Sequence, residues 1–310
     1  MKSERQTPQW RLWLFGRTSH TYAAIIFWLL SLILFWQPLS DLARLSFHDE
    51  LASHVLLIPL ISAFLVYLER NRIFRAPRYC PSIGVPLLLL TVILWYSIRT
   101  PLSSMNSTDR LSVVTALIVL TWIAAFILFY GTSSFKAAAF PLAFLFLMSP
   151  LPGVVAEHSI SFLQKGSADT CYALFRLVGI PVLRHGFVFS LPGVDIEVAK
   201  QCSGIHSGLS LFIAGLLAQH FLLQNAWKKA CFTLCIIPVA IFKNAVRIVT
   251  IAWLGIKVNP DFFHGSLHRR GGLPFSLLAL ALMALLLWLL RRPLVSRTHH
   301  PVRRETSGVA

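Results

Sequence analysis

Eight long apolar stretches run through this chain of 310 residues, and they constrain its fold more than any other feature. They lie at about residues 21–38, 53–68, 83–98, 111–130, 135–150, 205–223, 231–254 and 273–290. A helix needs roughly 17–25 predominantly apolar residues to cross a bilayer, so each stretch is a candidate transmembrane span. Only 13% of the residues are charged, which is too few to cover the surface of a soluble protein. We therefore predict an all-α polytopic membrane protein with about eight transmembrane helices, and we exclude a soluble enzyme and a disordered chain.

The basic residues predict the orientation of these helices. The chain has 28 Lys and Arg residues against 12 Asp and Glu residues, a net charge of +16. If the N-terminus is cytoplasmic, sixteen basic residues fall in cytoplasmic segments, and the longer outer loops hold only ten. This predicts an N-in/C-in topology with a basic cytoplasmic N-terminus (1–20), a single transmembrane domain (21–290) and a basic cytoplasmic tail (291–310). The charge excess then faces an anionic lipid bilayer, and we expect no nucleic-acid partner.

The extracytoplasmic loop at residues 151–204 is the longest connection in this topology. Its first part, about 154–178, is weakly apolar and interrupted by charges, which favours an interfacial or re-entrant helix. Its second part alternates loosely between apolar and polar residues around a turn at Pro192-Gly193. That pattern predicts a small strand pair, Val182–Leu191 and Val194–Lys200, over the membrane surface.

Two cations inside the seventh apolar stretch are candidates for a functional site. Lys243 and Arg247 are four residues apart and therefore share one face of a helix. An ionisable residue within a span is costly and indicates function by default. The alternative for Arg247 is a structural role, in which its long side chain reaches the lipid headgroups. Asn244, beside Lys243, indicates a polar surface that faces protein.

A cysteine and two histidines lie near the outer ends of the sixth and eighth stretches. Cys202 stands near the predicted N-terminus of a helix, where the helix dipole and nearby cations favour a thiolate. The alternative is an ordinary buried cysteine. His264 and His268 could each act as a base, and their spacing would also allow a shared metal ion. Because suitable carboxylate or cysteine partners are missing, we expect no metal, and we expect no cofactor.

The predicted topology brings Cys202, Arg247 and His268 to the same outer membrane face. Their spans follow one another through short connections, so they are expected to be neighbours. The three side chains form a coherent set for acyl transfer: an imidazole base, a thiolate nucleophile and a guanidinium that stabilises an oxyanion. Cys171 is also on the outer side, and a disulfide between it and Cys202 would block this chemistry.

Three motifs carry a resemblance to a known family. They are Glu197-Val198-Ala199-Lys200-Gln201-Cys202-Ser203-Gly204-Ile205, Asn244-Ala245-Val246-Arg247-Ile248, and His268 with Gly272 and Phe275. Weaker matches are Ser53-His54, Ser149-Pro150-Leu151-Pro152 and Gly179-Ile180-Pro181-Val182. Over about residues 45–290, the chain resembles the exosortase/archaeosortase family of membrane cysteine transpeptidases. Two positions depart from the family pattern: His206, where many members carry Arg, and Lys200-Gln201, where an acidic or small pair is common.

The resemblance implies an activity, a partner and a location. It implies a bacterial inner-membrane protease/transpeptidase, associated with exopolysaccharide systems, with its active site at the extracytoplasmic face. The substrates would be exported proteins that end in a short motif, often Pro-Glu-Pro, followed by a membrane helix and a basic tail. Cleavage would pass through an acyl-enzyme on Cys202, with His268 as acid/base, Arg247 as oxyanion stabiliser and residues 195–275 as the catalytic part. The spacing to Gly272 favours His268 over His264, which remains the alternative base.

Substrate recognition and the class of function leave alternatives open. An acidic residue in a sorting motif would need polar or cationic partners. The candidates for substrate binding are Lys243, Asn244, Ser203, Lys200, Arg269 and His54. The alternative function is a transporter or a polysaccharide-assembly or export component that binds an anion through Lys243 and Arg247. A third possibility is a non-catalytic scaffold, in which replacing Arg247 by Lys would have little effect.

Overall fold

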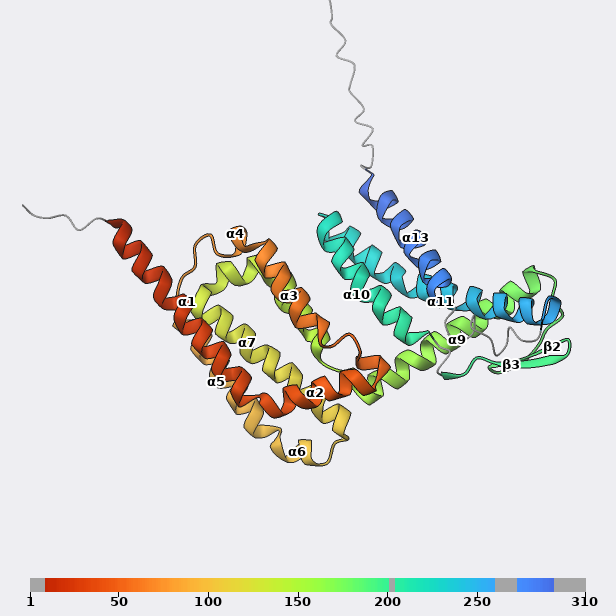
Figure 1. Cartoon of the computed structure of the whole chain (residues 1–310), viewed down its shortest axis with the longest axis horizontal. Helices are drawn as coiled ribbons and strands as arrows, with labels where there is room; N and C mark the ends of the chain where they lie inside the picture. Colours follow the sequence, from red (N-terminus) through yellow and green to blue (C-terminus); the bar gives the residue numbers. More distant parts are fainter. Residues whose placement is uncertain (1–8, 201–203, 260–271, 293–310) are drawn as a thin grey trace, which may run out of the picture. The chain divides into compact units, whose positions relative to one another are not determined.

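The computed structural model describes residues 9–200, 204–259 and 272–292, most of them in helices. The chain forms two compact units (Figure 1). Unit 1 comprises residues 1–166 and 198–206, and unit 2 comprises residues 167–197 and 207–310. One long helix, α9, begins in unit 1 and ends in unit 2.

Unit 1 is built from long apolar helices joined by short helical pieces. These elements are α1 (Gln9–Leu34), α2 (Trp36–His48), η1 (Glu50–Ala52), α3 (Leu57–Leu68), α4 (Arg70–Ile73), α5 (Pro81–Ser97), α6 (Arg99–Ser103), α7 (Ser107–Ala137), α8 (Ala139–Phe144), η2 (Leu145–Met148) and the first part of α9 (Gly153–Leu177). Helix α7 is central in this unit, because it contacts α1, α2, α4, α5 and η2 (Figure 1). It is also the most buried of the long apolar helices, so the core of unit 1 is organised around it.

Two glycines permit the close packing around α7. A Cβ atom at Gly84 of α5 would lie 2.5 Å from the Cα atom of Leu128, so only glycine allows the two helices to approach this closely. Gly131 interrupts α7 with a φ of 81°, which favours glycine over other residues. A Cβ atom at Gly131 would also lie 2.6 Å from the carbonyl oxygen of Arg78. The kink in α7 therefore lies directly against the segment that leads into α5.

The chain turns by 92° between the segment Ala139–Met148 and α9. Two hydrogen bonds to the first turns of α7 hold this bend. Ser149 Oγ donates to the carbonyl oxygen of Ser112 at 2.7 Å, and the Gly153 N–H donates to Oδ1 of Asp109 at 2.6 Å. The second bond satisfies an N–H group in the first turn of α9, where no intrahelical partner exists. The helix predicted near residues 154–178 is confirmed as α9, and its bend is that of a broken span or a re-entrant segment.

Unit 2 contains the end of α9, a small sheet and three long helices. The helices are α10 (Ile205–Leu222), α11 (Ala226–Lys257) and α13 (Gly272–Arg291). Gly208 lies against Ala240 and Gly215 against Ile236, so α10 and α11 pair in antiparallel fashion. Helix α13 packs along α11. The apolar core between these helices consists of Leu211, Leu223, Phe232, Ile236, Ala240, Ala279, Met283 and Leu287.

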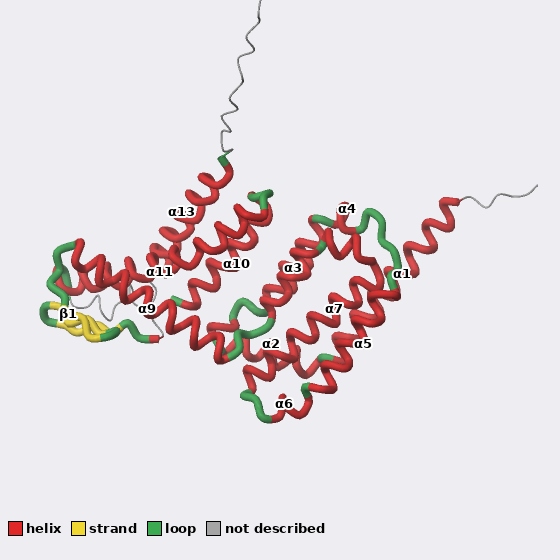
Figure 2. Tube along the Cα trace, turned by 180° about the vertical axis from the view of Figure 1, so that it is seen from behind, coloured by secondary structure: helices red, strands yellow, loops and turns green. Residues whose placement is uncertain are grey.

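The sheet has three antiparallel strands rather than the predicted two (Figure 2). The strands are β1 (Leu183–His185), β2 (Val188–Leu191) and β3 (Val194–Glu197). The prediction of one strand over Val182–Leu191 was wrong, because Gly186, with a φ of 65°, makes a turn within that segment. The turn predicted at Pro192-Gly193 is confirmed, since Leu191 pairs directly with Val194.

Side chains from β1 and β2 attach the sheet to α9. Phe189 is fully buried, and its ring centroid lies 5.6 Å from that of Phe175 in α9. The guanidinium of Arg184 forms a salt bridge of 2.8 Å with Asp169, also in α9. The sheet therefore packs on the last turns of α9.

The apolar stretches all coincide with helical segments, but they do not establish eight spans. Five helices are long and apolar enough to cross a membrane, or up to seven if each bent pair forms one span. Helix α5, with 17 residues, is shorter. The stretch 135–150 is divided among the end of α7, α8 and η2. The protein is thus a mainly helical, multi-pass membrane protein, and its N-in/C-in orientation stays a prediction.

Candidate active site

Three consecutive residues of α11, Lys243–Ala245, contact α9 and α10 within unit 2. The side chains of Lys243 and Asn244 are almost completely buried, with 5% and 1% of their surface exposed. Successive side chains on a helix point about 100° apart, so the two residues reach different neighbouring helices. The turn of α11 that contains Lys243 and Asn244 is therefore in contact with both α9 and α10.

Lys243 contacts the first turn of α10. Its Nζ atom donates a hydrogen bond to Oγ of Ser207. No acidic residue occurs in the sequence between Ile205 and Asn259, so neither α10 nor α11 contains a carboxylate that could neutralise this ammonium group. Burying a charge in such surroundings is costly, and the hydroxyl of Ser207 supplies a polar contact that compensates part of the cost.

Asn244 and Ala245 contact α9. The Nδ2 atom of Asn244 donates to Oγ of Ser167 at 3.0 Å, and Ser167 is fully buried. One turn further along α9, Sγ of Cys171 lies 3.7 Å from the carbonyl oxygen of Ala245. Ser167 and Cys171 therefore share the face of α9 that meets α11. Whether Cys171 pairs with Cys202 is untested, because Cys202 lies outside the described residues.

Arg247 lies one turn beyond Lys243 on the same side of α11 and is half-buried. Its guanidinium group offers five N–H donors, which suit a carboxylate or a developing oxyanion. The contacts of Lys243 and Asn244 hold the helical turn that comes immediately before it. Arg247 therefore extends from a part of α11 whose rotation is fixed by two neighbouring helices.

The chain on both sides of Cys202 is attached to other parts of unit 1. Four residues before it, the carbonyl oxygen of Val198 accepts a hydrogen bond of 2.6 Å from Nε2 of Gln164. Four residues after it, Nε2 of His206 lies 3.7 Å from the carboxylate of Glu50. Both Gln164 and Val198 are buried. These contacts connect Val198 and His206, which are described on either side of the undescribed residues 201–203, to other residues of unit 1.

Two further candidates for substrate binding belong to unit 1. His54 is half-buried and lies just after η1, the short helix that contains Glu50. Since Glu50 pairs with His206, this places His54 in the part of unit 1 that contacts the start of α10. Lys200 is exposed, immediately before the end of the described segment.

Five predicted site residues lie outside the described residues. They are Cys202, Ser203, His264, His268 and Arg269. Within the described ranges, no group of three or more His, Cys, Asp or Glu residues could hold a metal ion. The alternative of a metal bound by the two histidines is likewise outside these ranges.

The serine partners of the buried polar residues on α11 were not predicted from the sequence. Ser167 and Ser207 were not singled out, and neither was Gln164. A signal was present for two of them: Gln164, Ser167 and Cys171 follow the i, i+3, i+7 spacing of one helix face. A polar face on a weakly apolar helix indicates contact with protein rather than lipid.

Comparison with known proteins decides the family. The family model described as transmembrane exosortase matches residues 46–288, a range that includes every candidate site residue. The chain belongs to the transmembrane exosortase family. Searches of curated proteins and of solved structures gave no match. Membership confirms the resemblance seen in the sequence motifs, and at the level of the family it supports a membrane transpeptidase that acts on exported proteins.

Proposed function

We propose that this exosortase is a membrane-embedded cysteine protease/transpeptidase that cleaves C-terminal sorting signals. The proposed substrates are exported proteins whose signal consists of a Pro-Glu-Pro-like motif, a membrane helix and a basic tail. In this proposal Cys202 is the nucleophile, His268 the acid/base and Arg247 the oxyanion stabiliser. The site faces the extracytoplasmic side of a bacterial inner membrane.

The observation that carries the proposal is the position of Arg247 on α11 in a chain of this family. Helices α10 and α11 are antiparallel, and Ser207 in the first turn of α10 contacts Lys243. These contacts hold the turn of α11 that comes immediately before Arg247, and the family match spans both Cys202 and Arg247. Both observations support a role for the two residues on the same substrate carbonyl.

The proposed reaction has two acyl-transfer steps. The imidazole of His268 takes the proton of the Cys202 thiol, and the thiolate attacks the carbonyl carbon of the scissile peptide bond. Arg247 donates hydrogen bonds to the oxyanion that forms. As the C–N bond breaks, the imidazolium gives its proton to the leaving amine, and a thioester on Cys202 remains. An acceptor amine, or water, then attacks the thioester and releases the thiolate.

The candidate binding residues divide by exposure. Lys200 is exposed and suits direct contact with an acidic residue of a sorting motif. Lys243 and Asn244 are buried and already bonded to serines, which supports a role in positioning α11. His54, Ser203 and Arg269 remain proposed contacts, with His264 as the alternative base.

The decisive experiment is co-expression with a tagged protein that ends in a Pro-Glu-Pro motif, a membrane helix and a basic tail. We expect a size shift of the substrate with the natural enzyme and none with Cys202→Ala. Replacing Arg247 by Lys should lower the processing rate by about 10²–10³-fold, because an ammonium cannot reproduce the planar guanidinium. Processing by Cys202→Ala at the natural rate would overturn the proposal.

Matched controls separate chemistry from folding. Cys80→Ala removes a half-buried thiol from unit 1 and Arg99→Lys changes an exposed arginine, so neither substitution should alter processing. All variants are first compared for abundance in the membrane fraction. A loss of abundance in Arg247→Lys alone would indicate a structural role for that residue.

The alternative of an anion transporter is less well supported. Lys243 is 5% exposed and bonded to Ser207, whereas a residue of a transport pathway needs access to the transported ion. Transport would also not require a thiol. Uptake or export that persists in Cys202→Ala would favour this alternative.

A further inference from the structure

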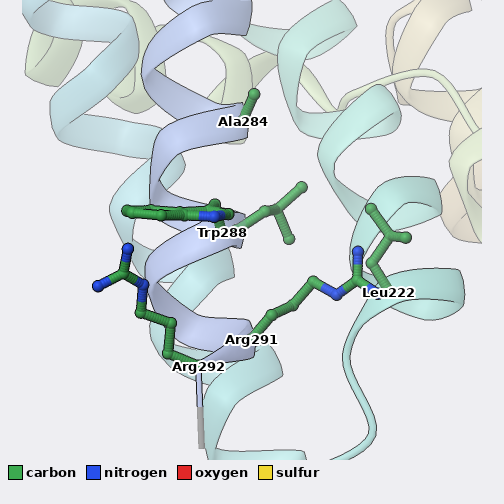
Figure 3. Close-up of a pocket in the computed structure, with 6 residues that line it drawn as sticks. Leu222, Ala284, Trp288, Arg291 and Arg292 are labelled. Atoms are coloured by element: carbon green, nitrogen blue, oxygen red, sulfur yellow. The ribbon is translucent and has the colours of Figure 1, made fainter.

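A pocket of about 340 Å³ lies between the end of α10 and the last turns of α13 in unit 2. Its lining is Leu222, Ala284, Leu287, Trp288, Arg291 and Arg292. Figure 3 shows Trp288 and the two arginines around this space, with the side chain of Arg291 extending toward Leu222 of α10. The pocket is thus apolar on the side of the helices and cationic at their ends.

Cations from two helices gather at this end of unit 2. Arg291 and Arg292 end α13, and Lys228 and Lys229 lie in the first turn of α11. The two ends are in direct contact, because Nζ of Lys228 donates to the carbonyl oxygen of Leu290 at 2.5 Å. Lys228, Arg291 and Arg292 therefore lie at one end of unit 2, with Lys229 next to Lys228 in the sequence, and we call these four residues the basic cluster.

Nothing within the neighbouring helices can neutralise the basic cluster. The sequences of residues 205–259 and 272–292 contain no Asp and no Glu. Within the described chain, Arg291 and Arg292 form no salt bridge. The guanidinium of Arg292 lies 3.5 Å from the ring centroid of Trp288, which orients it without neutralising it (Figure 3). Within these described helices no carboxylate supplies the complementary negative charge, which favours an anionic ligand at the basic cluster.

We propose that the pocket binds the phosphate headgroup of an anionic phospholipid. Arginine pairs well with phosphate oxygens, and basic pockets between the ends of membrane helices suit lipid headgroups. The volume is within the range of small-ligand sites. An acyl chain would continue along the apolar wall formed by Leu222 and Leu287. In the predicted orientation this lipid belongs to the cytoplasmic leaflet.

The phosphate could come from a lipid or from a soluble molecule, and the test distinguishes the two. The purified full-length protein in mild detergent is incubated with phosphatidylglycerol, phosphatidylethanolamine or inorganic phosphate, and bound lipid is counted by native mass spectrometry. We expect phosphatidylglycerol to be retained at least about fivefold better than phosphatidylethanolamine, from roughly 1 kcal/mol for each basic residue near an anionic lipid. Displacement of the lipid by excess inorganic phosphate would overturn a lipid site in favour of a soluble ligand.

Two variants and a control make the test specific to the pocket. R291Q/R292Q should bind both lipids equally. Phosphatidylglycerol should raise the melting temperature of the natural protein but not that of this variant. The control R70Q/R72Q removes the same charge from α4, where Arg70 also lies over an aromatic ring, and should keep the preference.

A second variant covers a failure of R291Q/R292Q to fold. Trp288→Leu leaves all charges in place but removes the ring beneath Arg292, and it should weaken retention of phosphatidylglycerol. Equal retention by Trp288→Leu and R70Q/R72Q would overturn the proposal. Because the measurement is lipid binding, its result is independent of whether the protein is a transpeptidase.

Discussion

The hydrogen bond between Asn244 and Ser167 offers a quantitative test of how α11 is held. The bond joins α11 to α9 at 3.0 Å, within the normal N–H···O range, and both residues are buried. Ser167→Ala removes the acceptor, Asn244→Ala removes the donor, and the double substitution removes both. If the contact holds α11 in place, the effects of the two substitutions should be coupled. The second substitution should then lower the free energy of unfolding less in the variant that already lacks the hydrogen bond than in the natural protein.

The expected energies follow from the burial of the pair. Hydrogen bonds between membrane helices contribute about 0.6 kcal/mol on average and up to about 1.7 kcal/mol. Ser167→Ala should therefore lower the free energy of unfolding by about 0.6–1.7 kcal/mol. Asn244→Ala also removes buried volume and should cost about 1–3 kcal/mol. The coupling energy of the pair should equal the cost of the hydrogen bond, about 0.6–1.7 kcal/mol.

The assay measures unfolding of the four proteins in mixed micelles by circular dichroism, together with the processing rate of a sorting substrate. If the hydrogen bond positions Arg247, the processing rate should fall by about threefold to twentyfold in Ser167→Ala. This substitution lies in α9 and changes no residue of α11. Asn225→Ala is the matched control, because Asn225 is exposed and its side chain makes no cap hydrogen bond at the start of α11. Strictly additive costs for Ser167→Ala and Asn244→Ala would refute the reasoning.

Two further predictions concern packing and the sheet. Gly84→Ala should lower the melting temperature clearly, since its Cβ atom would meet the backbone of Leu128 at 2.5 Å, whereas Gly208→Ala, with 3.8 Å to its nearest neighbour, should be nearly neutral. Equal melting temperatures for the two variants would contradict the packing argument. Asp169→Asn should cost only about 0.2–1 kcal/mol, because its salt bridge with Arg184 is half-exposed, yet it should speed hydrogen exchange in β1 and β2. Unchanged exchange there would show that Phe189 alone holds the sheet.

The positions of the helices could be predicted from the sequence, but their bends could not. Apolar stretches become helices because a membrane leaves backbone groups no other partner. The turn before α9 depends on contacts of Asp109 with Gly153 and of Ser112 with Ser149, pairs that are 44 and 37 residues apart. No local pattern contains such contacts, so the number of spans could not be derived from hydropathy alone.

The candidate site was predictable by residue type, and its supporting contacts were not. Lys243 and Asn244 are conspicuous because polar groups within an apolar stretch are costly. Ser167 and Ser207 are not, since a serine can bond to its own helix and is tolerated in membrane segments without a partner from another helix. Only the packing of α9 and α10 on α11 shows which serines meet buried polar groups. The division of the predicted strand at Gly186 was, by contrast, visible in the sequence as a glycine turn.

The identity of the partner of Lys243 has a consequence for the proposed chemistry. A serine hydroxyl contacts the ammonium group without cancelling its charge, whereas a carboxylate would cancel it. A turn of α11 that stays positive, one turn before Arg247, favours an oxyanion that exists only in the transition state. Ser207→Asp should therefore hold α10 and α11 together at least as well as serine does, yet lower the processing rate.

The control for Ser207→Asp is Ser207→Thr, which keeps a hydroxyl group. Threonine should retain both stability and processing, apart from the effect of one added methyl group. If Ser207→Asp instead processed the substrate as fast as the natural protein, the positive charge of this turn would have no part in the reaction. Lys243 would then act only as a contact between helices.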